Sequence, residues 1–191
     1  MDSDGEPRSP PIVLYDANLL YPFHLRNLFV QLGVNHIVAP RWTDAIHDEW
    51  IGSLCADGRA TRERLLRTRD IMNRILPEAN VRGYEYRIGM LTLPDPNDRH
   101  VLAAAIEAGA RAIVGFNVKD FPSPALAPYG IVAQDPDVFL CAQHAADPDA
   151  IVAVLEAART NLSRSAPSMD EFVRTLERQG LPNFAARVRR G

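Results

Sequence analysis

The stretch Ile12-Val13-Leu14-Tyr15-Asp16-Ala17-Asn18-Leu19-Leu20 decides the fold of this chain. Its first four residues are apolar, as in a strand that is buried on both faces of a parallel sheet. The strand ends on a carboxylate, Asp16, just before a helical pattern begins. An acid at this position either caps the following helix or helps to hold a metal ion, and the stretch alone leaves both roles open.

Alternating strand and helix patterns continue from this stretch and predict an α/β fold with a parallel sheet. A helical pattern opens at Tyr21-Pro22 and stops at Gly33, and a second strand over residues 36–39 is closed by Pro40. Two further strands are expected, over residues 112–116 and 130–133. Helical patterns separate them and continue to the end of the chain.

The length of 191 residues allows one substantial core and a small appendage. No apolar run approaches the ~20 residues that a membrane-spanning helix needs, and residues 1–10 lack the basic and apolar regions of a signal peptide. We therefore expect a short disordered tail on a cytoplasmic protein. Cys55 and Cys141 are far apart and lie in apolar helical contexts, which predicts two buried free thiols rather than a disulfide or a zinc site.

The formal net charge of -3 argues against a protein that coats nucleic acid by bulk electrostatics. The basic residues are nevertheless concentrated in an amphipathic helix that follows Asp57-Gly58. Its arginines form either a solvated face, paired with Glu63 and Asp70, or a wall that grips phosphate groups. In the second interpretation, Arg62 and Arg69 hold the backbone of an RNA.

Four acids occupy positions from which they can converge. Asp16 ends the first strand, Glu49 lies on a helix capped by Thr43, Asp98 opens an alanine-rich helix, and Asp120 follows the strand near residue 114. Ligands bind beyond the carboxyl ends of the strands in open α/β sheets, where these acids would meet. Each alone has a plain alternative role, as a helix cap for Asp98 or as a solvated side chain for Glu49.

Clustered carboxylates need a cation, because two of them at ~4 Å repel by ~4 kcal/mol at an effective dielectric constant of ~20. A ligand set of oxygen atoms favours Mg²⁺ or Mn²⁺ over zinc. Such ions orient and deprotonate a water molecule and stabilise the charge that develops on a phosphodiester during its attack. The acids therefore predict nuclease chemistry.

The motifs YDANLL around Asp16, the helix of Glu49, DPNDRHVLAAAIEAGA around Asp98 and IVGFNVKDFP around Asp120 together resemble the PIN-domain family, in particular VapC-type ribonuclease toxins of bacterial toxin–antitoxin pairs. The resemblance covers residues 11–140. It implies a three-layer α/β/α fold, a Mg²⁺-dependent site that cleaves RNA such as tRNA or rRNA, inhibition by a cognate antitoxin protein, and a homodimer.

Carried over residue by residue, the resemblance makes Asp16, Glu49, Asp98 and Asp120 the catalytic metal ligands. Many relatives have an aspartate where this chain has Asn117, so Asp120 must supply the charge and Asn117 supports a ligand or the loop. Asp95 is a candidate for an extra metal ligand. Asn18 is expected to position the loop after the first strand.

Two other functions remain open at this point. The chain could be a catalytically weak RNA-binding or partner-binding module, which Asn117 would permit. It could also be a phosphatase with Asp16 as nucleophile, although that chemistry favours a second acid two residues later, where this chain has Asn18.

The last part of the chain, residues 143–191, has a different pattern and predicts a small helical C-terminal extension. Its expected helices run from Asp147-Pro148 to Arg159 and from Ser168 or Asp170 to Gln179, followed by a short piece over 183–190. The predicted domains are thus a tail (1–10), a PIN-like nuclease domain (11–142) and this extension.

Overall fold

A computed structural model describes residues 9–190, so most of the predicted N-terminal tail lies outside the described residues. Its centre is a four-stranded sheet in the order β2-β1-β3-β4, with all neighbouring strands parallel. The strands are β1 (Ile12–Tyr15), β2 (Ala39–Arg41), β3 (Ala112–Val114) and β4 (Val132–Gln134). The predicted α/β class and the central parallel sheet are confirmed.

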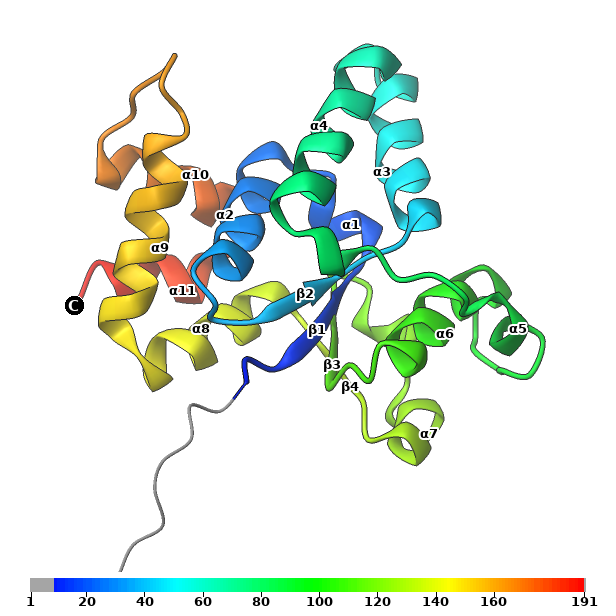
Figure 1. The fold of residues 1–191 in the computed structure, drawn as a ribbon. Helices are drawn as coiled ribbons and strands as arrows, with labels where there is room; N and C mark the ends of the chain where they lie inside the picture. The colour runs from blue at the N-terminus through cyan, green and yellow to red at the C-terminus, as the bar shows by residue number, and fades with distance from the viewer. Residues whose placement is uncertain (1–8, 191) are drawn as a thin grey trace, which may run out of the picture.

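Helices surround this sheet and make up most of the described chain (Figure 1). In chain order they are α1 (Ala17–Leu20), α2 (Phe23–Val34), α3 (Asp44–Ala56), α4 (Arg62–Ile75), α5 (Glu85–Ile88), α6 (Arg99–Glu107), α7 (Ser123–Leu126), α8 (Pro136–Ala146), α9 (Pro148–Thr160), α10 (Met169–Arg178) and α11 (Pro182–Val188). Four single turns of 3-10 helix also occur: η1 (Pro77–Ala79), η2 (Pro96–Asp98), η3 (Val118–Asp120) and η4 (Ala127–Tyr129). Within the described residues, no helix is both long and apolar enough to cross a membrane.

Strand β1 is the structural centre of the core. Val13, Leu14 and Tyr15 are each at most 2% exposed, and the register pairs Leu14 with Arg41 on one side and with Ile113 on the other. The apolar run is uninterrupted because both faces of this strand are covered by helices. Helix α6 packs on β1 and β3, whereas α2 packs near β2, and the two helices lie on different sides of the sheet in Figure 1.

Two expectations about where α2 and β2 end were wrong. Gly33 lies inside α2, and a Cβ atom there would come within 2.6 Å of Cγ of Pro40, so close packing rather than helix termination requires this glycine. Pro40 does not close the second strand but stands at its centre, paired with Val13. A proline is tolerated there because β2 is at the edge of the sheet and an edge residue can lack a donor on its outer side.

The helix rich in arginine is α4, and its apolar face is only partly covered. Leu65 and Met72 are buried, but Ile71 is 51% exposed and Ile75 is 47% exposed. Both cysteines are free, as expected, but Cys55 and Cys141 are only partly buried, so their predicted full burial was wrong.

The C-terminal helices pack against α2 through both apolar and polar contacts (Figure 1). Asn27 on α2 donates a hydrogen bond of 2.6 Å to the carbonyl oxygen of Ala158 on α9, and it accepts one of 3.0 Å from Asn161. The proposed boundary at residue 143 falls within α8 and stays a prediction.

Candidate active site

The site begins at the end of β1, where Asp16 is buried and only 3% exposed. Its Oδ1 accepts a hydrogen bond of 2.8 Å from the backbone N–H of Ala17, and its Oδ2 accepts one of 2.7 Å from the side-chain amide of Asn18. Asp16 is therefore a helix cap for α1 and a buried acid at the sheet edge at the same time. The two roles that the sequence left open are compatible.

Asn18 joins the loops that follow β1 and β3. Its amide nitrogen also donates to Oδ1 of Asn117, and its own Oδ1 accepts a hydrogen bond of 2.9 Å from the backbone N–H of Phe116. One side chain thus orients Asp16 and fixes the neighbouring loop. The expectation that Asn18 positions the loop after the first strand agrees with these contacts.

Gly115 allows these two loops to approach each other. A Cβ atom at this position would lie 2.9 Å from Oδ1 of Asn18 and 2.9 Å from Cβ of Asp16. Real side chains do not tolerate such contacts, so only glycine lets β3 continue past the acid without displacing it.

Glu49 reaches the same place from α3. Its side chain is 47% exposed, and Oε1 lies 2.7 Å from Nε2 of His100 on α6. The side chain is therefore neither packed inward nor free in water. It is held at the opening of the cleft by a histidine that our sequence analysis did not select.

Asp98 lies at the N-terminal end of α6 but makes no side-chain capping hydrogen bond to that helix. Burial, followed by the negative charges of Asp95 and Asp120, raises its pKa to about 6, and nearby Glu49 adds to this shift. The ordinary capping role thus does not account for Asp98.

The pKa of Asp16 is also raised to about 6, mainly because burial removes its carboxylate from water. The hydrogen bond from Ala17 opposes this shift, whereas the charges of Glu49 and Asp98 add to it. The three acids therefore influence one another electrostatically, which means that their carboxylates lie close together.

Asp16, Glu49 and Asp98 line a common cleft of about 490 Å³, together with Asn18, Asn117, Tyr21, Trp50 and Ser53. None of the described residues that line it is basic. Asp120 does not line this cleft. It lies in η3, near enough to raise the pKa of Asp98.

Asp95 has a local role in the structure. Its carboxylate is exposed and accepts a hydrogen bond of 2.8 Å from the backbone N–H of Asn97, which caps η2. Its assignment as an extra ligand stays a prediction, as do the metal-binding roles of the other acids.

The donor atoms of the cleft are of the chemical type that hard divalent cations prefer. They are carboxylate and amide oxygens, the type that Mg²⁺ and Mn²⁺ prefer, and none of the described residues that line the cleft is basic. Among the described residues, no three Asp, Glu, His or Cys side chains are close enough together to hold a metal ion in this arrangement. Glu49 is instead bound to His100.

The two arginines expected to hold RNA are engaged elsewhere. Arg62 forms an ion pair of 3.3 Å with Asp48, and Arg69 forms one of 2.8 Å with its neighbour Asp70. The pairing of this helix with Asp70 agrees with the solvated-face interpretation. Arg67 likewise pairs with Glu63 on the same helix.

His100 is the residue that the sequence interpretation missed. It stands two positions after Asp98 in DRHV, and position and charge type alone give no reason to aim it at α3. The sequence offered one sign, because His100 stands in the first turn of the helix that Asp98 opens.

An all-parallel sheet with an acidic cleft beyond its carboxyl edge is consistent with the PIN-like class of α/β folds. Two comparisons with known proteins add to this and confirm the resemblance to VapC-type proteins. Residues 136–190 match the family of the VapC50 C-terminal domain. The protein named Putative ribonuclease VapC50, from Mycobacterium tuberculosis (strain ATCC 25618 / H37Rv), is 56% identical to this chain over 46 residues.

These similarities cover only part of each protein. The 46 matched residues are 24% of this chain and 27% of the relative, so the match spans about a quarter of that protein's length. The family match comprises α8 to α11 and contains none of the acids that line the cleft. No solved structure matches the chain.

Proposed function

We propose that this protein is a Mg²⁺-dependent endoribonuclease and the toxin of a type II toxin–antitoxin pair. The observation that carries the proposal is that Asp16, Glu49 and Asp98, which are 82 residues apart in sequence from first to last, line one cleft without a basic residue. The partial similarity to a protein named as a ribonuclease supports the reaction class.

Each residue of the cleft has a distinct task in this proposal. Asp16, Glu49 and Asp98 would hold the metal ion, with Asp120 adding negative charge nearby. A bound Mg²⁺ would activate a water molecule and offset the charge that develops on the phosphodiester. Asn18 keeps the Asp16 carboxylate oriented through its 2.7 Å hydrogen bond, and His100 keeps Glu49 at the opening of the cleft.

Partners follow from the same proposal. The substrate would be RNA, with tRNA and rRNA as the first candidates, and the protein would act in the cytoplasm. A cognate antitoxin protein would inhibit it, and a second copy of the chain would complete a homodimer.

The proposal is tested with the purified protein and a structured RNA. Cleavage should require Mg²⁺ or Mn²⁺ and stop in excess EDTA. Asp16→Asn should abolish cleavage while the circular dichroism spectrum stays that of the native protein. Full activity in Asp16→Asn would refute the assignment.

One observation favours a second candidate, a non-enzymatic RNA-binding or partner-binding module. Asn117 is an amide where a fourth carboxylate would strengthen metal binding, and it is already bonded to Asn18. This alternative predicts RNA binding without any metal-dependent turnover, so the same cleavage assay separates the two.

A further inference from the structure

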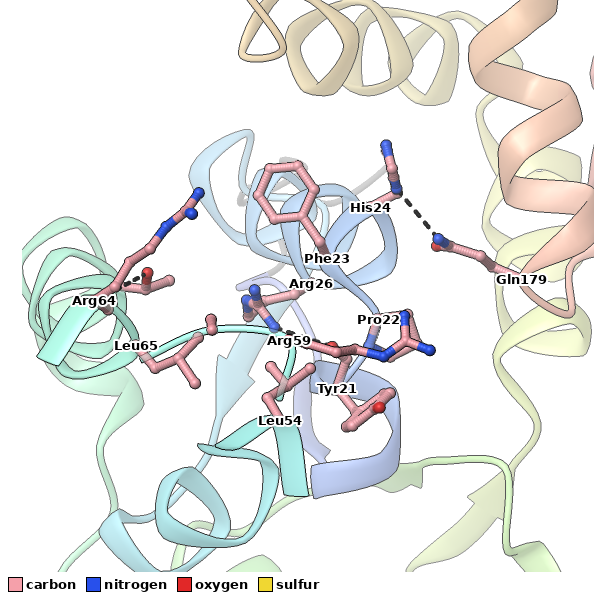
Figure 2. Close-up of a pocket in the computed structure, with 12 residues that line it drawn as sticks. Tyr21, Pro22, Phe23, His24, Arg26, Leu54, Arg59, Arg64, Leu65 and Gln179 are labelled. Atoms are coloured by element: carbon pink, nitrogen blue, oxygen red, sulfur yellow. Dashed lines mark hydrogen bonds between the residues drawn. The ribbon is translucent and has the colours of Figure 1, made fainter. Parts of the chain in front are cut away.

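A groove beside the acidic cleft has a cationic and aromatic lining. It has a volume of about 480 Å³ and lies between α2, the start of α4 and the end of α10 (Figure 2). Tyr21 lines both this groove and the acidic cleft, so the two hollows are adjacent. None of the twelve described residues that line the groove is acidic.

The floor of the groove contains a buried positive charge. Arg26 is 5% exposed, and its guanidinium group lies 4.5 Å from the centre of the Trp50 ring. It donates hydrogen bonds to backbone carbonyl oxygens, including one of 3.2 Å to Tyr21, and no carboxylate within the described residues forms an ion pair with it. A buried charge without a counterion favours an anion nearby.

Two more guanidinium groups stand at the edge of the groove. Arg59 and Arg64 are exposed and, unlike Arg62 and Arg69, make no ion pair with any described acid. Both are therefore free to contact a ligand in the groove. Three cationic side chains and no acidic one make the groove complementary to a polyanion.

The groove also offers a surface for a base. Phe23 is 54% exposed, although phenylalanine side chains are usually buried in the core. Figure 2 shows its ring on α2, between Arg64 on α4 and Gln179 at the end of α10. An exposed aromatic ring among arginines is the arrangement on which single-stranded nucleic acids stack.

The far side of the groove belongs to the C-terminal helices. The amide nitrogen of Gln179 lies 3.2 Å from Nδ1 of His24. Its Oε1 is buried and has no hydrogen-bond partner in the described part of the chain. The adjacent Gly180 contacts Phe116, whose backbone N–H bonds Asn18 of the acidic cleft.

We propose that this groove is the subsite for the single-stranded RNA segment adjoining the scissile phosphodiester, and that the C-terminal helices complete it. Arg59 and Arg64 contact the phosphates, and Phe23 stacks on a base. The inference rests on the proposed ribonuclease function, to which it adds a binding path that enters the cleft beside Tyr21.

The test measures binding apart from cleavage. A fluorescein-labelled single-stranded RNA of mixed sequence is titrated with the full-length protein in EDTA, over a series of salt concentrations, and fluorescence anisotropy is read. Combining Arg59→Ala with Arg64→Ala should weaken binding roughly tenfold at low salt and reduce the slope of log K against log salt by ~1.4. The matched control combines Arg67→Ala with Arg74→Ala, which removes the same charge from α4 outside the groove and should change affinity by less than about twofold.

Phe23→Ala separates stacking from charge. It should weaken binding by roughly tenfold and leave the salt slope unchanged, because the lost contact is with a base. Thermal melting of every variant verifies that it is folded.

Equal affinities for the Arg59/Arg64 variant and its control would overturn the proposal. So would displacement of the RNA by a glutamate decapeptide whose own binding is lost in the same variant, since the groove would then accept an acidic protein segment. Failure of the nuclease proposal is distinguishable: it would leave RNA binding and its dependence on Arg59 and Arg64 intact, with no cleavage when Mg²⁺ is added.

Discussion

Nε2 of His100 lies 2.7 Å from Oε1 of Glu49, and this contact joins α6 to α3 across the opening of the acidic cleft. The other ring nitrogen, Nδ1, is buried without a hydrogen-bond partner among the described residues. Within the part of the chain that the structure describes, His100 is the side chain that pairs with the Glu49 carboxylate. Partners of this kind orient metal-binding carboxylates in proteins.

The first prediction concerns this pair. His100→Ala should weaken Mg²⁺ binding by roughly tenfold, because Glu49 loses the contact that holds it at the cleft. Isothermal titration calorimetry measures the affinity directly. His100→Gln, which can still donate a hydrogen bond to Glu49, should recover most of it. Unchanged affinity in His100→Ala would show that His100 plays no part in positioning Glu49.

The second prediction is a gain of stability in an inactive variant. Asp16 has a pKa raised to about 6, so its ionised form at pH 7 opposes folding. A shift of two units corresponds to ~3 kcal/mol, but the new amide of Asp16→Asn faces the amide of Asn18, so we expect a net gain of ~1 kcal/mol in the free energy of unfolding. Urea denaturation at pH 7 measures it.

Mg²⁺ provides the internal comparison for the same variant. The ion should raise the melting temperature of the wild type, because a ligand of the folded state stabilises it, and should have little effect on Asp16→Asn. Asp149→Asn, at an exposed position on α9, is the control and should change stability by less than ~0.5 kcal/mol. A variant less stable than the wild type without Mg²⁺ would contradict the prediction.

The third prediction compares two glycines. Gly115→Ala should cost ~1–3 kcal/mol of stability, because its methyl group would overlap Asn18 and Asp16, and cleavage should be lost with it. Gly52→Ala on α3 has no atom within 4 Å of the new methyl group and should stabilise the helix by ~0.5–1 kcal/mol. Thermal denaturation and the RNA cleavage assay, run side by side, distinguish the two outcomes.

The fourth prediction concerns the dependence of stability on pH. His47 is fully buried, and burial lowers its pKa to about 4. Between pH 6.5 and 4 the unfolded chain therefore binds a proton that the folded chain does not, so His47 makes stability fall as the pH falls. Asp16 has the opposite effect below about pH 6, because its folded form binds the proton more readily.

These two contributions partly cancel in the wild type, and single variants should separate them. Asp16→Asn should lose stability more steeply between pH 6.5 and 4, whereas His47→Gln should lose it less steeply. Urea midpoints collected across this range give both slopes. Parallel curves for the three proteins would rule out His47 and Asp16 as the groups responsible.

The fifth prediction concerns the last helix. Asp137 on α8 is buried and accepts hydrogen bonds from the backbone N–H groups of Asn183 and Phe184, at 3.0 and 2.7 Å, at the start of α11. Asp137→Ala would leave these donors unpaired, at a cost of ~2–3 kcal/mol. Limited proteolysis should then cut near residue 181. Asp170→Ala, which removes an exposed partner of Arg174, should leave the cleavage pattern unchanged.

The sequence was sufficient to predict the order of the four strands and the longer helices along the chain, because their apolar periodicities are strong, whereas α7 was not predicted. The run at β1 and the cap at Thr43 belong to local patterns that need no tertiary information. The roles of Gly33 and Pro40 were misjudged because they depend on a tertiary contact. Each meets the other across two elements, and that contact exists only once α2 and β2 have packed.

The candidate site was predictable in its acids but not in its supporting contacts. The position of Asp16 at a strand end and of Asp98 at a helix start is local, and the topology of parallel sheets brings such ends together. The pairing of Glu49 with His100 depends on how α3 and α6 are placed. Likewise, the ion pair of Arg62 with Asp48 joins α4 to α3 and could not be predicted, whereas the pairing of α4 arginines with Glu63 and Asp70 is local and was expected.

Pro40 has a further consequence at the outer edge of the sheet. Ala39 directs its N–H towards β1, where it bonds the carbonyl oxygen of Pro11, so the N–H that Pro40 lacks would have pointed outward. Beyond β2, Trp42 forms a bridge with Asn80, which occupies the next stretch of that edge. This side of the sheet thus offers little to a foreign strand, and the protein is protected there against the edge-to-edge polymerisation that threatens exposed sheets.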